Sequence, residues 1–269
     1  MTESGGAAPG GEGRLPPEPD SAYKRRLYDT YYSTHIRGRK GEASSEQFAV
    51  RARVYDANWS RLLPADRDVA ILDAGCGTGS LVWWLQRGGF ARAEGIDVSP
   101  EQIEIAKGLG VRNVAVADLR HHLSLRRGCY DVLILRDVLE HFDRPRILEV
   151  LELCREALRE TGTLLVQVPN AEAPLWGRIR YGDFTHELAF TEASLRQVFG
   201  SLGFASVAVH PAGPVRLRAR DLPRQMLWRC LEVVYKLMVF AETGRRWAVV
   251  TESIIAAARP SAGPAQEPR

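Results

Sequence analysis

The chain has 269 residues, of which 45% are hydrophobic and 26% charged, and its formal net charge is +3. This length has room for one α/β domain with additions and a large buried core. The small net charge argues against a dedicated nucleic-acid-binding protein, which would show a basic stripe. The four cysteines form no C-x-x-C pair, so they fit neither a zinc site nor a disulfide framework. We therefore expect a protein of a reducing compartment with no nucleic-acid partner.

The ends of the chain and its hydropathy bear on location. The N-terminus lacks the positive-then-apolar pattern of a signal peptide. No run of about eighteen apolar residues occurs, so no membrane-spanning segment is expected and the expected location is the cytoplasm. Residues 1–20 and 261–269 are rich in Pro and small residues and offer little to bury, which predicts disordered tails.

Residues 21–64 are predicted to hold two helices ahead of the first strand. The first covers 21–34, where tyrosines recur at helical spacing and Ser21 can act as N-cap. A polar loop follows up to Ser45, and the second helix runs from there to Leu63, before Pro64.

Val69 to Gly79 reads V-A-I-L-D-A-G-C-G-T-G and predicts a buried strand followed by a sharp turn. Glycine lacks a Cβ, so the backbone can turn tightly, and its N–H groups can approach a ligand. A helix begins at Ser80. Strand, glycine turn and helix open a nucleotide-binding α/β unit, with the ligand at the carboxyl end of the strand.

The alternation of strands and helices continues from there, which predicts a parallel sheet covered by helices on both faces. The further strands are expected at 91–96, 111–117, 130–135, 162–168, 205–210 and 253–259. The helices between them are expected at 100–109, 146–158, 192–202 and 223–240. Residues 170–191 are irregular and rich in aromatic side chains, and a loop of this length in a compact domain is usually functional.

The helix predicted over 223–240 is apolar around most of its circumference. Only Gln225, Arg229, Glu232 and Lys236 form a polar stripe. A helix of this kind must be covered, by the fold itself, by a second copy in a homodimer or by lipid. We expect it to pack against the fold.

The glycine spacing separates two families of nucleotide-binding proteins. A dinucleotide fingerprint would place glycines at 75, 77 and 80, but position 80 is Ser80 and the third glycine is Gly79. D-x-G-x-G-x-G, from Asp73 to Gly79, resembles motif I of the class I methyltransferases that use S-adenosylmethionine (SAM). The resemblance implies that Asp73, Gly75, Cys76, Gly77 and Gly79 bind this cofactor.

The same resemblance implies the fold and the domain organisation. It is a Rossmann-like, seven-stranded, mostly parallel sheet with helices on both faces and an N-terminal helical cap. The cap would be 21–64 and the SAM-binding domain 65–260, with loop 170–191 and helix 223–240 as additions. In such enzymes the cap often covers the cofactor, which makes Tyr31 a candidate contact.

Two acidic residues at strand ends support the cofactor assignment. Asp97, followed by Val98, can accept hydrogen bonds from both ribose hydroxyls, although a nicotinamide cofactor would need the same residue. Asp118 and Leu119 resemble the pair that holds adenine in class I methyltransferases. Arg136, at the end of the fourth strand, completes the expected cofactor site.

Val138-Leu139-Glu140-His141 resembles the small-molecule O-methyltransferases typified by ubiquinone-biosynthesis enzymes. A hydroxyl acceptor needs a base, and histidine is suited to that role near neutral pH. His141 and His186 are the candidates; the alternatives are a capping or cofactor contact for His141 and a loop hydrogen bond for His186. Residues 183–191 are similar to bacterial family members from glycan and secondary-metabolite loci, so we expect a sugar, glycolipid precursor or secondary metabolite as acceptor.

Several other functions stay open at this point. They are methylation of nitrogen or carbon, SAM binding without transfer, and nicotinamide-dependent oxidation or reduction. A nucleic-acid amino-methyltransferase would show N-P-P-Y or D-P-P-Y where this chain has Arg136-Asp137-Val138-Leu139. No His/Asp/Glu cluster has metal-ligand spacing, so we expect catalysis without a metal ion.

Overall fold

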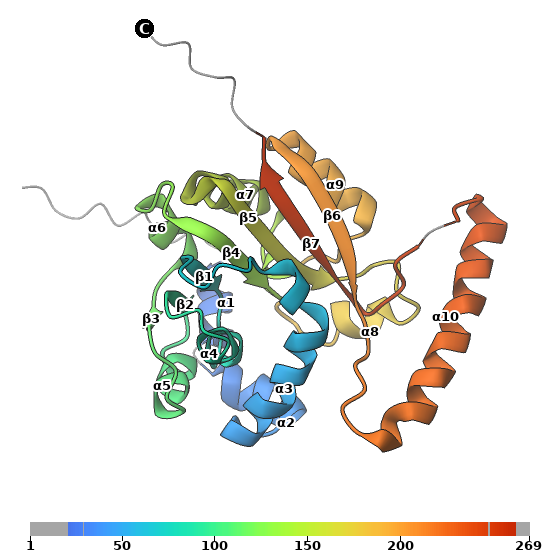
Figure 1. Ribbon diagram of the computed structural model, residues 1–269, viewed down its shortest axis with the longest axis horizontal. Helices are drawn as coiled ribbons and strands as arrows, with labels where there is room; N and C mark the ends of the chain where they lie inside the picture. Colours follow the sequence, from blue (N-terminus) through green and yellow to red (C-terminus); the bar gives the residue numbers. More distant parts are fainter. Residues whose placement is uncertain (1–20, 29, 247, 262–269) are drawn as a thin grey trace, which may run out of the picture.

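The computed structural model describes residues 21–28, 30–246 and 248–261 (Figure 1). The tails predicted over 1–20 and 261–269 therefore lie outside the described residues, apart from Ser261. Within the described part, the strands form one seven-stranded sheet in the order β3-β2-β1-β4-β5-β7-β6. The strands are β1 (Ile71–Ala74), β2 (Ala93–Asp97), β3 (Val114–Val116), β4 (Tyr130–Arg136), β5 (Leu158–Pro169), β6 (Phe204–Ala212) and β7 (Ser253–Pro260).

The first five strands are parallel, and β7 is antiparallel to both of its neighbours, β5 and β6. The predicted mostly parallel sheet is thus confirmed. The apolar runs of β1 and β4 lie at its centre, where every residue of β1 is buried. An antiparallel β7 inserted beside β5 departs from the 3-2-1-4-5-6 order of dinucleotide-binding folds.

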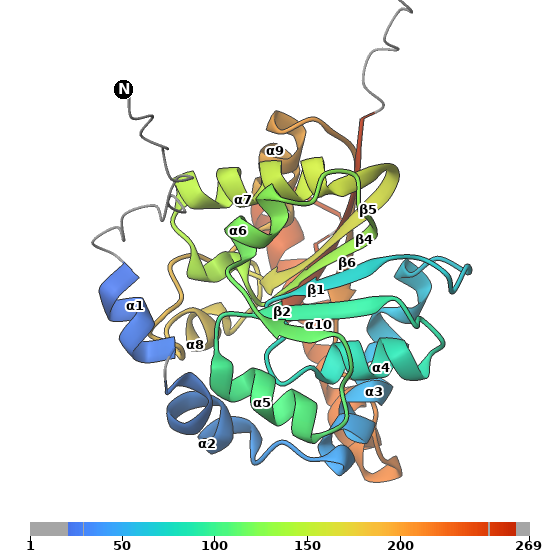
Figure 2. The ribbon, with the colours of Figure 1, turned by 90° about the vertical axis from the view of Figure 1, so that its left-hand side faces the viewer.

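Helices cover both faces of the sheet (Figure 2). One core cluster joins the sheet to α6 (Leu119–Ser124), α7 (Arg144–Ala157) and α9 (Glu192–Ser201). Two further clusters join it to α3 (Ser45–Asn58), α4 (Ser80–Arg87) and α5 (Pro100–Gly108). Local sequence sets the helix starts: Ser99 caps α5 and Asp143 caps α7, each ahead of a proline in the first turn.

Helix α6 was not expected from the sequence. Asp118 caps it by accepting a hydrogen bond from the His121 N–H. His122, one of two adjacent histidines on this helix, is 9% exposed and its Nε2 lies 3.0 Å from the Tyr130 hydroxyl. Tertiary packing outweighs the polar character of this short segment.

The N-terminal part forms α1 (Ser21–Tyr28), the π-helix η1 (Tyr32–Ile36) and α2 (Arg37–Lys40) before α3 and the 3-10 helix η2 (Ser60–Leu62). Residues 34–40, expected to be loop, are therefore helical. The side chain of Tyr32 is 5% exposed, and its hydroxyl accepts a hydrogen bond from the Ala43 N–H at 2.7 Å. This buried anchor, rather than helix propensity, explains the extra turns.

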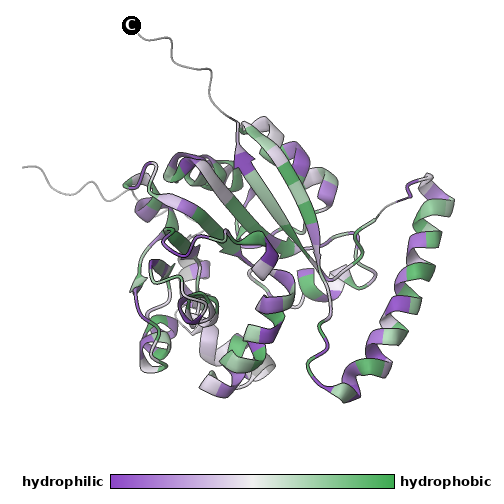
Figure 3. Cartoon of the chain, viewed as in Figure 1, coloured by the Kyte–Doolittle hydropathy of each residue, from purple (hydrophilic) through white to green (hydrophobic). Residues whose placement is uncertain are grey.

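Helix α10 (Leu222–Thr243) contradicts the expectation that it packs against the fold. It follows the 3-10 helix η4 (Ala219–Asp221), stands apart from the sheet and its covering helices, and has no buried residue (Figure 1). Hydrophobic residues occur along its whole length (Figure 3). In the part of the chain that the structure describes, no helix combines the length and hydropathy needed to cross a membrane.

Candidate active site

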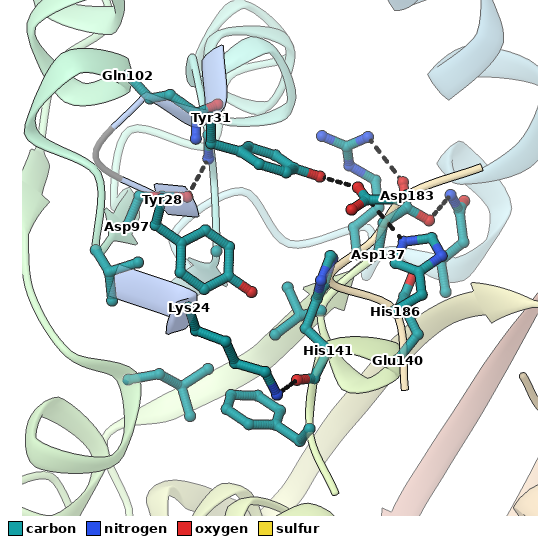
Figure 4. A pocket seen from close by; sticks show the side chains of 18 of the residues that line it. Lys24, Tyr28, Tyr31, Asp97, Gln102, Asp137, Glu140, His141, Asp183 and His186 are labelled. Carbon is teal, nitrogen blue, oxygen red and sulfur yellow. Dashed lines mark hydrogen bonds and ion pairs between the residues drawn. The ribbon is translucent and has the colours of Figure 1, made fainter. Parts of the chain in front are cut away.

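A cavity of about 540 Å³ opens at the carboxyl ends of the parallel strands. It lies where the sheet order reverses between β1 and β4, which is the ligand position of open α/β folds. Residues from the glycine turn, the strand ends, the N-terminal cap and loop 170–191 line it (Figure 4). The predicted site residues among them are Tyr31, Gly75, Gly77, Asp97, Val98, Asp118, Leu119, Arg136, His141 and His186.

Backbone hydrogen bonds within the protein fix the glycine turn. The N–H groups of Gly75 and Cys76 both donate to the Ile96 carbonyl, and the Gly79 N–H donates to the Cys76 carbonyl. Gly75 has φ +86°, and a Cβ there would lie 2.4 Å from Cγ2 of Val138. The expectation that these N–H groups face a ligand is corrected: the glycines act by bringing a bare backbone to the cavity wall.

Three predicted residues of the motif, Asp73, Cys76 and Gly79, do not line this cavity. Gly79 begins α4 with φ +76°, and a Cβ on it would lie 3.1 Å from Ala106 and 3.2 Å from Val111. Its place in the structure is close helix packing. Cys76 lines an adjoining cavity of about 210 Å³, together with Arg51 and Tyr55.

Asp97 joins the turn to the end of β2. Its carboxylate accepts hydrogen bonds from the N–H groups of Gly77 at 2.8 Å and Ser99 at 2.9 Å. Burial raises the pKa of Asp97, and these two hydrogen bonds oppose the rise. The carboxylate keeps acceptor capacity for a ligand, since an ionised carboxylate offers about four lone-pair sites. Asp118 lines the same cavity while it caps α6.

Buried polar atoms without partners occur in β1, at Asp73, and in the cavity wall, at Arg136. Asp73 is 0% exposed, and neither carboxylate oxygen has a hydrogen-bond partner among the described residues. Burial raises its pKa to about 7, although Arg136 opposes this. The buried Nε of Arg136 also has no partner within the described part of the chain. Orphaned groups of this kind are rare in native proteins, and the Arg136 Nε is the one of them that a polar ligand in the cavity would reach most directly, because Arg136 lines it.

His141 follows β4 in the 3-10 helix η3 (Leu139–His141) and is held in one orientation. Its Nδ1 lies 2.8 Å from Oγ1 of Thr185, whose hydroxyl donates at 2.6 Å to Asp183. Because that hydroxyl donates to Asp183, it accepts from Nδ1–H of His141, and the neutral ring leaves Nε2 unprotonated. Burial and the neighbouring His186 lower the pKa of His141 to about 4.

His186 has a different environment. Its Nδ1–H donates to the carbonyl of Ile179 at 3.1 Å, in α8 (Trp176–Arg180), and its Nε2 lies 3.8 Å from Asp183. Burial lowers its pKa even though Asp183 acts in the opposite direction. These contacts agree with the alternative interpretation of His186 as a residue that stabilises the loop.

Asp183 links the cap to the loop; it is the first residue of the segment 183–191 noted for its family resemblance, which assigned it no role. The Tyr31 hydroxyl donates to its carboxylate, and Nε2 of His35 lies 3.2 Å from it. Burial would raise its pKa, but hydrogen bonds from Thr185 and Tyr31 outweigh burial and lower the pKa to about 2. Lys24 adds a second link by donating to the His141 carbonyl at 2.7 Å (Figure 4).

A possible metal-binding arrangement arises only in the fold. Glu140, His141 and His186 each offer a ligand atom, and these atoms lie within 4.8 Å of one another. The sequence gave no sign of this cluster, because Glu140 and His141 are adjacent and His186 follows 45 positions after His141. Catalysis without a metal ion stays a prediction: dialysis against EDTA should leave turnover unchanged, and a loss that Mg²⁺ or Zn²⁺ restores would contradict it.

Comparison with known proteins decides the family. Residues 48–209, more than half of the chain, match the family described as a methyltransferase domain. The chain belongs to this family. The assignment made from the motif, to the class I SAM-dependent methyltransferases, is thereby confirmed.

The methyltransferase domain also resembles individual proteins. It is 30% identical over 111 residues to a ubiquinone biosynthesis O-methyltransferase of Cronobacter sakazakii, covering 39% of this chain and 44% of that protein. It is 32% identical over 124 residues to a tRNA U34 carboxymethyltransferase of Aeromonas hydrophila, covering 42% of this chain and 36% of that protein. The matches thus span less than half the length of these relatives.

Solved structures share the fold. A SAM-dependent methyltransferase of Archaeoglobus fulgidus has a TM-score of 0.61 at 20% identity, covering 85% of this chain and 99% of that one. Magnesium protoporphyrin IX methyltransferase of Synechocystis, solved with bound S-adenosylhomocysteine (SAH), has a TM-score of 0.55 at 20% identity. The alignment covers 88% of this chain and 100% of that one. These likenesses confirm the Rossmann-like methyltransferase fold.

Proposed function

We propose that this methyltransferase domain binds SAM and transfers its methyl group to a hydroxyl of a small-molecule acceptor. The residues present fit the cofactor. The cavity has the size of a small-molecule site, at about 540 Å³. Asp97 and Asp118 line it with acceptors for a ribose diol and an adenine amino group, and the partnerless Nε of Arg136 offers a donor for a carboxylate.

SAM supplies an activated methyl group on its sulfonium, so the hard chemistry belongs to the cofactor. The protein has to position the acceptor, remove its proton and exclude water. His141 faces the cavity with Nδ1 tied to Thr185 and Nε2 without a hydrogen bond among the described residues, so Nε2 takes the proton. The cap, joined to Asp183 through Tyr31, covers the reacting groups.

The buried environment of this base favours one class of acceptor. A histidine with its pKa lowered to about 4 is a weak base and needs a hydroxyl that ionises readily. A phenol ionises with a pKa of about 10, as in tyrosine, and an alcohol hydroxyl does so far less readily. We therefore place phenols and catechols ahead of the sugars favoured by the sequence. The O-methyltransferase relatives support oxygen as the acceptor atom.

The observation that carries this proposal is the chain of contacts from Asp183 through Thr185 to His141. The test incubates the protein with methyl-labelled SAM and a panel of catechols, phenols, sugars and amines. We expect label in a methyl ether of a catechol or phenol. Transfer to amines alone would contradict the hydroxyl assignment, and SAH binding without any transfer would support a SAM-binding protein that is not an enzyme.

A further inference from the structure

The apolar side of α10 is turned to solvent. Seven of its large apolar residues are between 53% and 62% exposed: Met226, Leu227, Leu231, Val233, Val234, Leu237 and Met238. The polar stripe of the helix lies on another side, and two of its members pair with each other, Lys236 with Glu232 at 2.7 Å. At 1.5 Å per residue, this 22-residue helix is about 33 Å long, and its strongly exposed apolar residues, from Met226 to Met238, span about 18 Å of it. A contiguous face of this kind marks an interaction site.

The charge around α10 differs in sign from that of the remaining chain. Residues 216–246 contain eight basic and three acidic side chains, which gives +5. The chain as a whole has 36 basic and 33 acidic residues, so the other residues hold 28 basic and 30 acidic side chains, or −2. The positive charge is therefore concentrated on residues 216–246 and mostly flanks α10, whose own 22 residues hold three basic and two acidic side chains, or +1.

The basic residues flank both ends of the apolar face. Arg216, Arg218, Arg220 and Arg224 are exposed at the N-terminal end, and none of them forms an ion pair among the described residues. Arg245 and Arg246 are exposed at the C-terminal end, where Arg245 also pairs with Glu172 at 2.7 Å. An apolar helix between clusters of arginine is the pattern that binds anionic lipid headgroups.

We propose that α10 is an interfacial helix that docks this protein on an anionic lipid surface, with its apolar face in the headgroup region and its arginines on the phosphates. A second copy fits less well, because parallel and antiparallel pairing both bring a basic end beside another basic end. An RNA would satisfy the arginines and leave the apolar face uncovered. The helix lies outside residues 48–209, so this property is additional to the shared methyltransferase domain.

The experiment is co-sedimentation of the full chain with vesicles of phosphatidylcholine alone or mixed with phosphatidylglycerol. We expect binding to the mixed vesicles only, and binding should weaken between ~50 mM and ~500 mM salt because the charges are exposed. Leu231→Glu/Leu237→Glu should abolish it. Arg216→Gln/Arg218→Gln/Arg220→Gln should weaken it by about tenfold or more.

Leu125→Glu/Leu148→Glu is the matched control, because it adds the same charge at two exposed leucines outside α10, 69% and 40% exposed. It should bind as the wild type does. All variants should keep the thermal stabilisation by SAH, which shows that they are folded. Equal binding of the α10 and control variants, or no binding to either vesicle, would overturn the proposal.

Two further measurements distinguish the other occupants. Sedimentation equilibrium should show a monomer; a dimer that Leu231→Glu/Leu237→Glu dissociates would assign the face to a second copy and overturn the proposal. In a gel-shift assay, unfractionated tRNA should form no complex at protein concentrations lower than those that give vesicle binding. A tighter complex that depends on the arginines and not on Leu231 would also overturn it.

Discussion

At the scale of single residues, the neighbours of His141 determine its chemistry. Thr185 and Asp183 fix its tautomer, and burial keeps it neutral. His186 lies beside it, with ring centroids 4.7 Å apart, but donates to a backbone carbonyl of α8. The two candidate bases of the sequence analysis thus separate into a proposed base and a loop residue.

His141→Gln should lower turnover by about a hundredfold or more, because it removes the proton acceptor. The affinity for SAH should change less than about threefold, since the proposed cofactor contacts lie elsewhere in the cavity. Turnover with the identified acceptor and calorimetric titration with SAH measure the two effects. His210→Gln, on β6, is the matched control. An equal loss of SAH affinity in His141→Gln would assign the residue to cofactor binding instead.

The lowered pKa of His141 also makes stability depend on pH. The folded state holds the neutral ring, so its contribution is complete above the ordinary pKa of 6.5 and is lost as the pH falls toward 4. Between pH 7 and pH 5 the free energy of unfolding should fall in both proteins. The fall should be about 2 kcal/mol larger in the wild type than in His141→Gln. Urea unfolding at the two pH values measures this difference. Parallel losses in both proteins would show that His141 titrates normally.

Sequence reasoning at this scale placed residues at the cavity where a motif or a strand end fixed their position, and their roles stay predictions. Asp97, Asp118 and His141 all line the cavity, as expected from strand ends. Asp183 and Thr185 lie in the segment 183–191 noted in the sequence, but their roles were not predicted, because these depend on how loop 170–191 folds back against η3. A short polar residue in an irregular segment carries no periodic signal that would place it.

At the scale of elements, the glycine turn is the most constrained piece of the chain. Gly75 needs a positive φ and leaves no room for a Cβ beside Val138. The turn also rests on β2, because two of its N–H groups donate to Ile96. Its geometry is thus fixed by packing before any ligand binds.

Gly75→Ala should destabilise the protein by about 1 to 3 kcal/mol and weaken SAH binding, since both the positive φ and the contact with Val138 oppose a side chain. Gly108→Ala is the control, because a Cβ at this helical position meets nothing within 4 Å. It should be neutral or slightly stabilising. Thermal unfolding with and without SAH reports both effects. Similar stabilities for the two variants would refute the packing argument.

Elements with a clear period were predicted closely, and those held by tertiary contacts were not. The strands β1 to β5 and helices α5, α7 and α9 lie where alternation and capping residues placed them. Residues 34–40 became helical because Tyr32 is buried. The pattern of α10 correctly predicted a helix that needs a cover, but hydropathy cannot tell which partner supplies it.

At the scale of the whole molecule, the sheet order, the cap and loop 170–191 enclose one cavity, whereas α10 points its apolar side outward. The strand order, with its antiparallel β7, agrees with the match to the methyltransferase family. Both observations argue against the alternative that the protein is a nicotinamide-dependent oxidoreductase. The proposed function rests on the claim that this cavity binds SAM.

The most direct test is the thermal stabilisation of the purified protein by SAH, with NAD and NADP measured alongside. A ligand that binds only the folded state raises the melting temperature with its concentration. At a hundredfold excess over Kd, SAH should raise it by about 5 °C or more, and Asp97→Ala should reduce that shift. Neither dinucleotide should have an effect. A shift with NAD or NADP and none with SAH would contradict the assignment of the cofactor and, with it, the proposed methyl transfer.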